Sequence, residues 1–263
     1  MNKEKFLKNK YFIKIKNNIL LDENKHIIEN NFNNIISTYI KSLNYNLYVS
    51  YYKDNDILRC KELDFCLKIN CRNKLFNKII IINETEEPID FIDNTDKRII
   101  IINNKKRQTY YDFFKISNIY SDEETINVLC NSDIIIGENF DKINLKKDQI
   151  FLLERYEIDN NGFHLKIDLN GSDTWIWKGL FDTKLDIGQY YMGLPYCDFK
   201  LASDFFKNNF KLKNPMIDLK TYHIHLSGIR NFTDLDKVKS FLFLKLKQSK
   251  LDDIFDEKDY ILV

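Results

Sequence analysis

The sequence predicts an α/β fold with a mainly parallel, Rossmann-like central sheet flanked by helices. Short, continuous runs of β-branched residues, of which Lys78–Asn83 (KIIIIN) and Arg98–Asn103 (RIIIIN) are the clearest, are typical of strands buried on both faces. These runs alternate with segments of helical spacing as far as residue 155. Such alternation indicates βαβ units, whose strands pair in parallel.

Each element follows from its own local pattern. Leu47–Tyr52 is rich in β-forming residues and predicts a strand, and the polar run after it supplies helix N-cap candidates. Ile57–Asn70 is expected to be a helix because its apolar residues recur at spacings of three and four. Further strands are predicted at Thr125–Leu129, Gln149–Glu154 and Ile217–Leu226, and further helices at Asn31–Leu43, Arg107–Asn118 and Cys197–Asn209.

The composition of the sequence excludes several classes of protein. The 263 residues suffice for a large core, and 40 basic against 39 acidic residues give a net charge of +1. This balance argues against a dedicated nucleic-acid binder and against a polybasic membrane-surface protein. No apolar run approaches transmembrane length, and five cysteines without a CxxC pair indicate reduced thiols in a cytoplasmic protein. Without an internal repeat or a clear linker, residues 1–263 are predicted to form one domain.

Asn131-Ser132-Asp133 follows a predicted buried strand. In open α/β sheets, ligands bind beyond the carboxyl ends of the strands, so Asp133 is placed to hold a divalent metal and a diphosphate. The alternative is an ordinary turn capped by Asp133. His223 and His225 are two residues apart in a predicted strand, and their side chains therefore share one face. Two imidazoles on one face suit a metal or a phosphate, but each could also be a structural residue.

Six more residues are candidates for a site. Asp198 begins a predicted helix and is either a first-turn residue favoured by the helix dipole or a general base facing a cleft. Asp173 and Trp175 combine an acid with an aromatic ring, which suits either a sugar-stacking surface or the core. Arg107, Arg155 and Arg230 are each at an element boundary, and each is either a surface residue or a phosphate ligand.

Several motifs of well-known enzymes are missing from the sequence. It contains no Walker loop, GxGxxG, GxSxG or HExxH motif, which leaves P-loop NTPases, dinucleotide oxidoreductases, α/β-hydrolases and zincin proteases without support.

Several segments together resemble GT-A-like glycosyltransferases of bacterial polysaccharide gene clusters and large DNA viruses. The resemblance covers about residues 45–232. Its segments are RCKEL at 59–63, NE at 83–84, RQTYYD at 107–112, NSDI at 131–134, ERY at 154–156, SDTWIWKG at 172–179, LPYCDFKLA at 194–202 and NPMIDLKTYHIHLSGIRNF at 214–232.

The resemblance implies a nucleotide-binding half at about 45–155, an acceptor half at about 156–232 and a tail at 233–263. It also implies a nucleotide-sugar donor, a glycan or other hydroxyl acceptor, and Mn²⁺ or Mg²⁺ bound by Asp133 with His223 or His225. Asn131 replaces the first acid of the D-x-D motif of such enzymes.

The remaining roles follow from the same resemblance. Asp198 matches the base of inverting members, while Asp173 and Trp175 would shape the sugar pocket. Asn131 would bind the donor, Arg107 would contact the nucleotide or its phosphates, and Arg230 would contact the phosphates.

Two rival functions remain. The missing first acid also fits a catalytically silent GT-A-like module that binds a glycan or acts as a scaffold. A nucleotidyltransferase would need a glycine-rich basic loop after the first strand, and Tyr51–Asn55 does not provide one.

Overall fold

The structure, a computed structural model, describes residues 44–85, 87–159, 162–165, 171–229, 236–240 and 242–262. The helix expected at Asn31–Leu43 lies outside these residues. None of the described helices is both long and apolar enough to cross a membrane.

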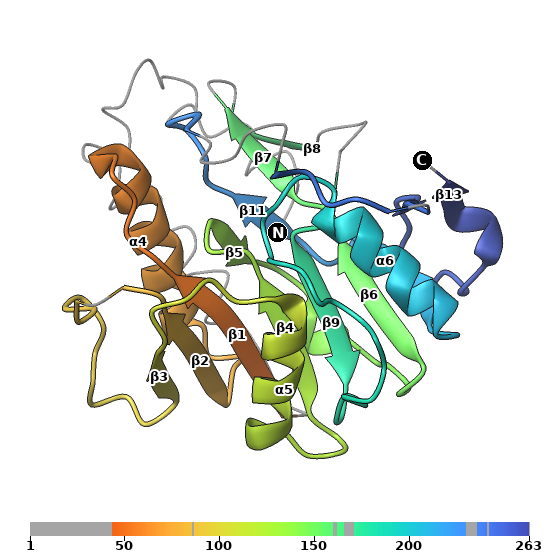
Figure 1. The fold of residues 1–263 in the computed structure, drawn as a ribbon, viewed down its shortest axis with the longest axis horizontal. Coiled ribbons are helices and arrows are strands. Elements are labelled where there is room, and N and C mark those ends of the chain that lie inside the picture. Colours follow the sequence, from red (N-terminus) through yellow and green to blue (C-terminus); the bar gives the residue numbers. More distant parts are fainter. Residues whose placement is uncertain are drawn as a thin grey trace.

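A seven-stranded, mostly parallel sheet forms the centre of the molecule (Figure 1). In spatial order its strands are β10 (Lys211–Lys213), β6 (Gln149–Leu153), β9 (Thr174–Lys178), β4 (Ile126–Cys130), β1 (Tyr45–Tyr51), β2 (Lys78–Asn83) and β3 (Ile99–Asn103). Strand β1 pairs in parallel with β2 and β4, β2 with β3, and β6 with β10. The prediction of a mainly parallel central sheet is confirmed.

Strand β9 is the exception. It runs antiparallel to both β4 and β6 in the middle of the sheet. No strand was predicted at this segment, where Asp173 and Trp175 were expected either in a sugar-stacking surface or in the core. The TWIWK run is buried on both sides, so it shows no alternation of polar and apolar residues that would mark a strand.

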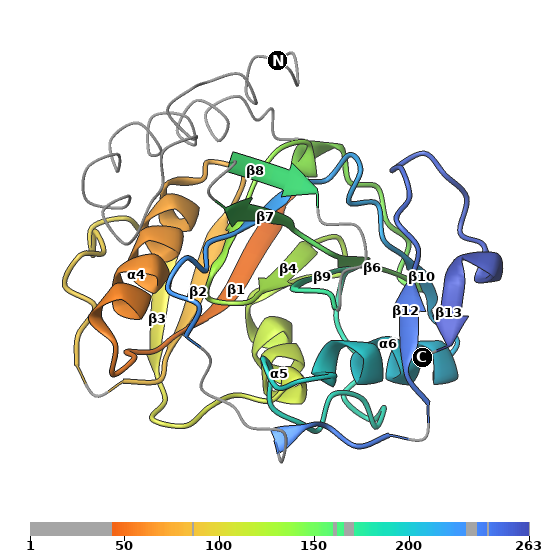
Figure 2. The ribbon, with the colours of Figure 1, turned by 90° about the horizontal axis from the view of Figure 1, so that it is seen from above.

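Helices cover the two faces of the sheet (Figure 2). They are α4 (Ile57–Arg72), α5 (Tyr110–Tyr120) and α6 (Cys197–Lys207). Leu47 and Val49 of β1 share a core cluster with Leu63 and Leu67 of α4, whereas Tyr48 belongs to a second cluster with α5 and α6. Because successive strand residues point to opposite faces, α4 covers one side and α5 and α6 cover the other.

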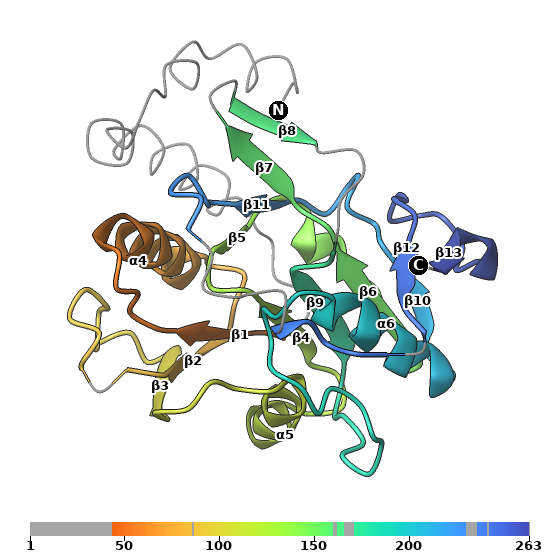
Figure 3. The ribbon, with the colours of Figure 1, turned by 45° about the horizontal axis from the view of Figure 1, so that its top comes forward.

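A four-stranded sheet beside the central one brings distant segments together (Figure 3). Its order is β5 (Ile134–Ile136), β11 (Thr221–His223), β7 (Tyr156–Asp159) and β8 (Gly162–Leu165). Strand β11 pairs with β5 so that His223 lies opposite Ile134. The predicted strand Ile217–Leu226 is much shorter in the structure, because the chain turns at its start and leaves β11 at Ile224.

The end of the chain packs back on the central sheet. Strands β12 (Leu244–Leu246) and β13 (Tyr260–Leu262) form a two-stranded sheet, and Leu244 and Leu246 are buried in the cluster that contains α6 residues. Lys213 of β10 donates a hydrogen bond to the carbonyl of Leu251 at 2.7 Å. Short 3-10 helices complete the described elements at Phe140–Lys142 and Glu257–Asp259.

Candidate functional site

A cavity of about 490 Å³ opens beyond the carboxyl ends of β1, β2 and β4. Ser50 near the end of β1, Glu84 after β2 and Asn131 after β4 line one wall, and Pro195 and Asp198 at the start of α6 line another. A cavity at this edge of the parallel strands agrees with the usual position of ligand sites in open α/β sheets.

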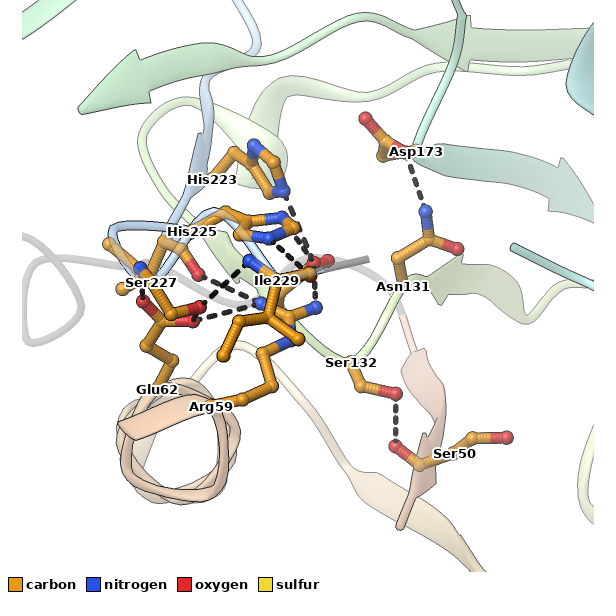
Figure 4. Close-up of polar contacts among 12 residues, drawn as sticks. Ser50, Arg59, Glu62, Asn131, Ser132, Asp173, His223, His225, Ser227 and Ile229 are labelled. Carbon is orange, nitrogen blue, oxygen red and sulfur yellow. Dashed lines mark hydrogen bonds and ion pairs between the residues drawn. The ribbon is translucent and has the colours of Figure 1, made fainter. Parts of the chain in front are cut away.

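Asp133 stands in the break between β4 and β5. The break is held by Asn131, whose amide N–H donates to the Asp173 carbonyl at 3.0 Å, and by the Ser132 hydroxyl, which donates to the Ser50 carbonyl at 2.8 Å (Figure 4). The Asp133 carbonyl accepts from the Ile224 N–H at 2.9 Å. These bonds tie the break to β1, to β9 and to the segment that carries both histidines.

The structure brings Asp133, His223 and His225 together across ninety residues of chain. Asp133 Oδ2 lies 3.1 Å from His223 Nε2 and 3.9 Å from His225 Nδ1. The same oxygen accepts from Arg59 Nη2 at 2.6 Å. Figure 4 shows Arg59 extending from α4 toward the two imidazoles. Glu62, one turn along α4, accepts from Arg59 Nη1 at 3.1 Å.

Each imidazole is oriented through its other nitrogen. His223 Nδ1 lies 2.8 Å from Glu157 Oε2, and His225 Nε2 donates to the Ile229 carbonyl at 2.7 Å. The second nitrogen of each ring therefore faces Asp133. Metal-bound histidines usually show this arrangement, in which the outer N–H is held by a carboxylate or a carbonyl. One ligand atom from each of the three residues lies within 4.8 Å of the others, so the cluster fits a divalent cation.

Charge within the cluster sets the protonation of its members. Burial acts to raise the pKa of Asp133, but positive His223 and Arg59 outweigh it and hold this pKa well below its usual range. Burial acts to lower the pKa of His223, but Asp133 and a hydrogen bond to Glu157 raise it to about 9. Burial, reinforced by Arg59 and His223, lowers the pKa of His225 to about 4. Without a metal, His223 is therefore cationic and His225 neutral at pH 7.

Asp198 presents its carboxylate to the same cavity from the second residue of α6. Its Oδ2 accepts from the Ser172 N–H at 2.9 Å. Gly171 has a φ of +120°, and a β-carbon there would collide with the Asp198 carboxylate. Burial, together with the charge of Asp173, raises the pKa of Asp198 to about 6. A carboxylate with such a pKa can accept a proton near neutral pH.

Asp173 lines the cavity but is engaged by two neighbours. Its carboxylate accepts from Arg155 and from the Asn131 side-chain amide. Burial raises the pKa of Asp173, although the charge of Arg155 opposes this rise. The hydrogen bond to Asp173 explains why residue 131 is an asparagine, because a carboxylate at this position would be repelled by the Asp173 carboxylate.

We expect Asn131→Asp to lower the free energy of unfolding by about 1–3 kcal/mol, because a donor to Asp173 becomes a second acceptor. Mn²⁺ affinity should not rise. Urea unfolding and Mn²⁺ calorimetry would measure both, with exposed Asn94→Asp as the control. Tighter Mn²⁺ binding at unchanged stability would contradict this explanation of the amide.

Trp175 does not lie on the cavity wall. It is fully buried in β9, and its ring contacts Tyr110 edge to face at 4.8 Å between centroids. A side chain without exposed surface cannot contact a sugar, so its predicted role in the sugar pocket is wrong. Asp173, which directly precedes β9, does line the cavity.

The structure describes only one of the two arginines, Arg107 and Arg230, that were predicted to bind the donor. Arg107 is exposed at the cavity, and its Nη2 donates to the Met192 carbonyl at 2.7 Å. Arg230 lies outside the described residues, so its predicted role stays a prediction.

No role was predicted from the sequence for three charged residues at this site: Arg59 and Glu84, which line the cavity, and Glu157, which holds His223. Arg155, predicted to be either a surface residue or a phosphate ligand, also lines the cavity, where it donates to Asp173. Glu84 directly follows β2, while Arg155 and Glu157 come just after β6. The presence of charged residues directly after predicted buried strands could therefore have identified these site residues from the sequence. Arg59 is in the first turn of α4, where its approach to Asp133 depends on tertiary packing.

No protein-family model and no curated protein matches the sequence. Among solved structures, a crystal structure of GalNAc-T7 with UDP, GalNAc and Mn²⁺ is similar at 11% sequence identity and a TM-score of 0.46. The match covers 74% of this chain and 46% of that chain, so the chain spans less than half the length of that protein. A likeness this distant does not assign an activity.

Proposed function

We propose that this protein is a GT-A-like glycosyltransferase that moves a sugar from a nucleotide-sugar donor to a hydroxyl of a glycan acceptor, with inversion. The observation that carries the proposal is the pairing of two groups in one cavity. An Asp-His-His cluster fits a divalent cation, and the Asp198 carboxylate has a pKa of about 6.

Asp133, His223 and His225 would hold the metal. Bound Mn²⁺ or Mg²⁺ would supply positive charge that stabilises the departing nucleoside diphosphate. The two imidazole ligands favour Mn²⁺ over Mg²⁺, which prefers an all-oxygen shell. Arg59 and Arg107 both line the cavity and can supply further positive charge to the phosphates.

Asp198 would act as the general base. Its carboxylate, held by the Ser172 N–H, would take the proton of the acceptor hydroxyl as the oxygen attacks the anomeric carbon. The bond to the diphosphate breaks on the opposite side of that carbon, which inverts its configuration. Asn131 and Asp173, both on the cavity wall, would face the donor and its sugar. We further propose that residues 1–263 work as one catalytic domain.

A screen of nucleotide sugars would test this function. The full chain should hydrolyse or transfer from at least one UDP- or GDP-sugar with Mn²⁺, and excess EDTA should abolish the reaction. Products would be measured as released nucleoside diphosphate. Turnover that is unaffected by excess EDTA would remove the metal role of Asp133 and the two histidines.

One observation favours a second candidate, a catalytically silent module that binds a glycan. Asp133 already forms an ion pair with Arg59 at 2.6 Å, and Asn131 replaces the first acid. Calorimetry with nucleotide sugars and Mn²⁺ separates the two functions. An enzyme must bind a donor, whereas a silent module that binds only glycans gives no donor signal.

A further inference from the structure

Tyr196 has an unusual backbone at the mouth of the cavity. It immediately precedes α6, with φ 66° and ψ 4°, in the left-handed region that bulky residues rarely adopt. This position normally favours Ser, Thr, Asp, Asn or Gly, whose side chains cap the helix or relieve strain. Tyr196 makes no side-chain cap. The local structure therefore gives no reason for a tyrosine there.

Packing in the core does not explain a tyrosine at this position either. Tyr196 lines the cavity with 40% of its surface exposed. Its ring packs at tilted angles against Phe199 at 6.1 Å and Phe243 at 5.5 Å between centroids. Lys237 Nζ lies 5.7 Å from the ring centre. The neighbours hold the ring in place yet leave a large part of it uncovered. Backbone strain kept at such a position is typical of functional sites.

The position of Tyr196 relative to Asp198 indicates which ligand the ring would meet. Tyr196 precedes Asp198 by two residues, and both line the wall made by the start of α6. The Asp-His-His cluster, which would hold the donor diphosphate, lies on the segments from β4–β5 and β11. The base must face the acceptor hydroxyl, so a ring beside the base belongs to the acceptor side.

We propose that Tyr196 is the acceptor platform of this protein, on which the apolar face of a pyranose ring packs while one of its hydroxyls reaches Asp198. This inference rests on the proposed glycosyltransferase function. An aromatic ring fixed in advance by Phe199 and Phe243 offers a large contact area at little cost in ordering.

The contacts with Phe243 and Lys237 suggest a structural alternative, in which Tyr196 serves only to hold the end of the chain. The Val238 N–H also donates to the Pro195 carbonyl at 3.0 Å. Loss of the ring would then lower stability without weakening glycoside binding. Stability and binding must therefore be measured on the same variants.

Ligand-observed NMR of the full chain with a panel of methyl pyranosides would test the platform. The key variant is Tyr196→Asn, because asparagine tolerates the left-handed backbone and removes the ring. We expect it to weaken glycoside binding about tenfold or more through loss of the ring contact. Tyr196→Phe should stay within about twofold of wild type, because it keeps the ring.

Tyr191→Asn is the matched control, since Tyr191 is 49% exposed on the same loop but does not line the cavity. Its glycoside binding should equal that of wild type, and thermal melting of each variant would show that it is folded. The platform is wrong if Tyr196→Asn binds as well as wild type, if Tyr196→Phe binds as weakly as Tyr196→Asn, or if wild type binds no methyl pyranoside.

Calorimetry with UDP- and GDP-sugars shows whether a negative result overturns only the role of Tyr196 or the proposed glycosyltransferase function itself. We expect Tyr196→Asn to bind donor like wild type, because the ring lies on the acceptor side. Equal loss of donor binding in this variant would overturn the acceptor assignment. Wild type that binds glycosides but no donor would overturn the glycosyltransferase function, and with it the description of this ring as an acceptor site.

Discussion

Asp198→Asn should lower sugar transfer by about a hundred- to ten-thousand-fold, the range expected when a general base is removed. Asparagine cannot accept the acceptor proton, but its side-chain oxygen can still accept from the Ser172 N–H. The cavity should therefore keep its shape and the donor should bind normally. Transfer would be measured with saturating donor, and donor affinity by calorimetry.

The pH dependence tests the same assignment. Only the ionised carboxylate is a base, so transfer by wild type should rise with pH through about 6, the raised pKa of Asp198. Because folding raises this pKa, the group favours the folded state at low pH, and this contribution is lost as pH rises through about 6. Asp198→Asn should therefore be at least as stable as wild type above pH 6.

Asp186→Asn provides a control for the loss of one negative charge, because Asp186 is exposed and does not line the cavity. It should transfer sugar like wild type. Asp198→Asn that retains transfer within a few-fold of wild type while binding donor would show that another group is the base.

Asp133→Asn should abolish Mn²⁺ binding and strongly destabilise the protein. The Asp133 carboxylate is the shared partner of Arg59 and His223, both of which are buried. Removing one member of a buried ionic network costs about 3–5 kcal/mol, because the remaining charges lose their partner. Urea unfolding in EDTA would measure this loss without a metal contribution. Unchanged stability and intact Mn²⁺ binding would contradict the cluster as described.

Metal binding should also release a proton. His223 has a pKa raised to about 9, so at pH 7 it carries a proton that a metal must displace, whereas His225 is already neutral. Mn²⁺ affinity should therefore rise with pH up to about 9. Calorimetry in buffers of different ionisation enthalpy would count about one proton released per Mn²⁺.

The metal-free protein should show the opposite trend in stability. Folding raises the pKa of His223 above its ordinary value of 6.5, so its stabilising contribution is complete below that pH and is lost as pH rises through about 9. His223→Gln should flatten both pH dependences. Mn²⁺ affinity that is independent of pH in wild type would show that His223 is not a ligand.

Local patterns in the sequence predict several elements correctly. The isoleucine runs of β2 and β3 and the helical spacing of α4 depend only on neighbouring residues, and the structure confirms them. Candidate ligands were also visible, because Asp133 follows a buried strand and His223 and His225 share a face.

The way in which these parts meet depends on tertiary contacts. The pairing of β11 with β5 places His223 beside Asp133, and the packing of α4 adds Arg59 to the same carboxylate. The antiparallel course of β9 buries Trp175 in the core. Strand order and helix docking depend on contacts between residues far apart in the chain, and local periodicity does not encode those contacts. The sequence therefore indicates which residues can carry chemistry, whereas the fold selects those that act together.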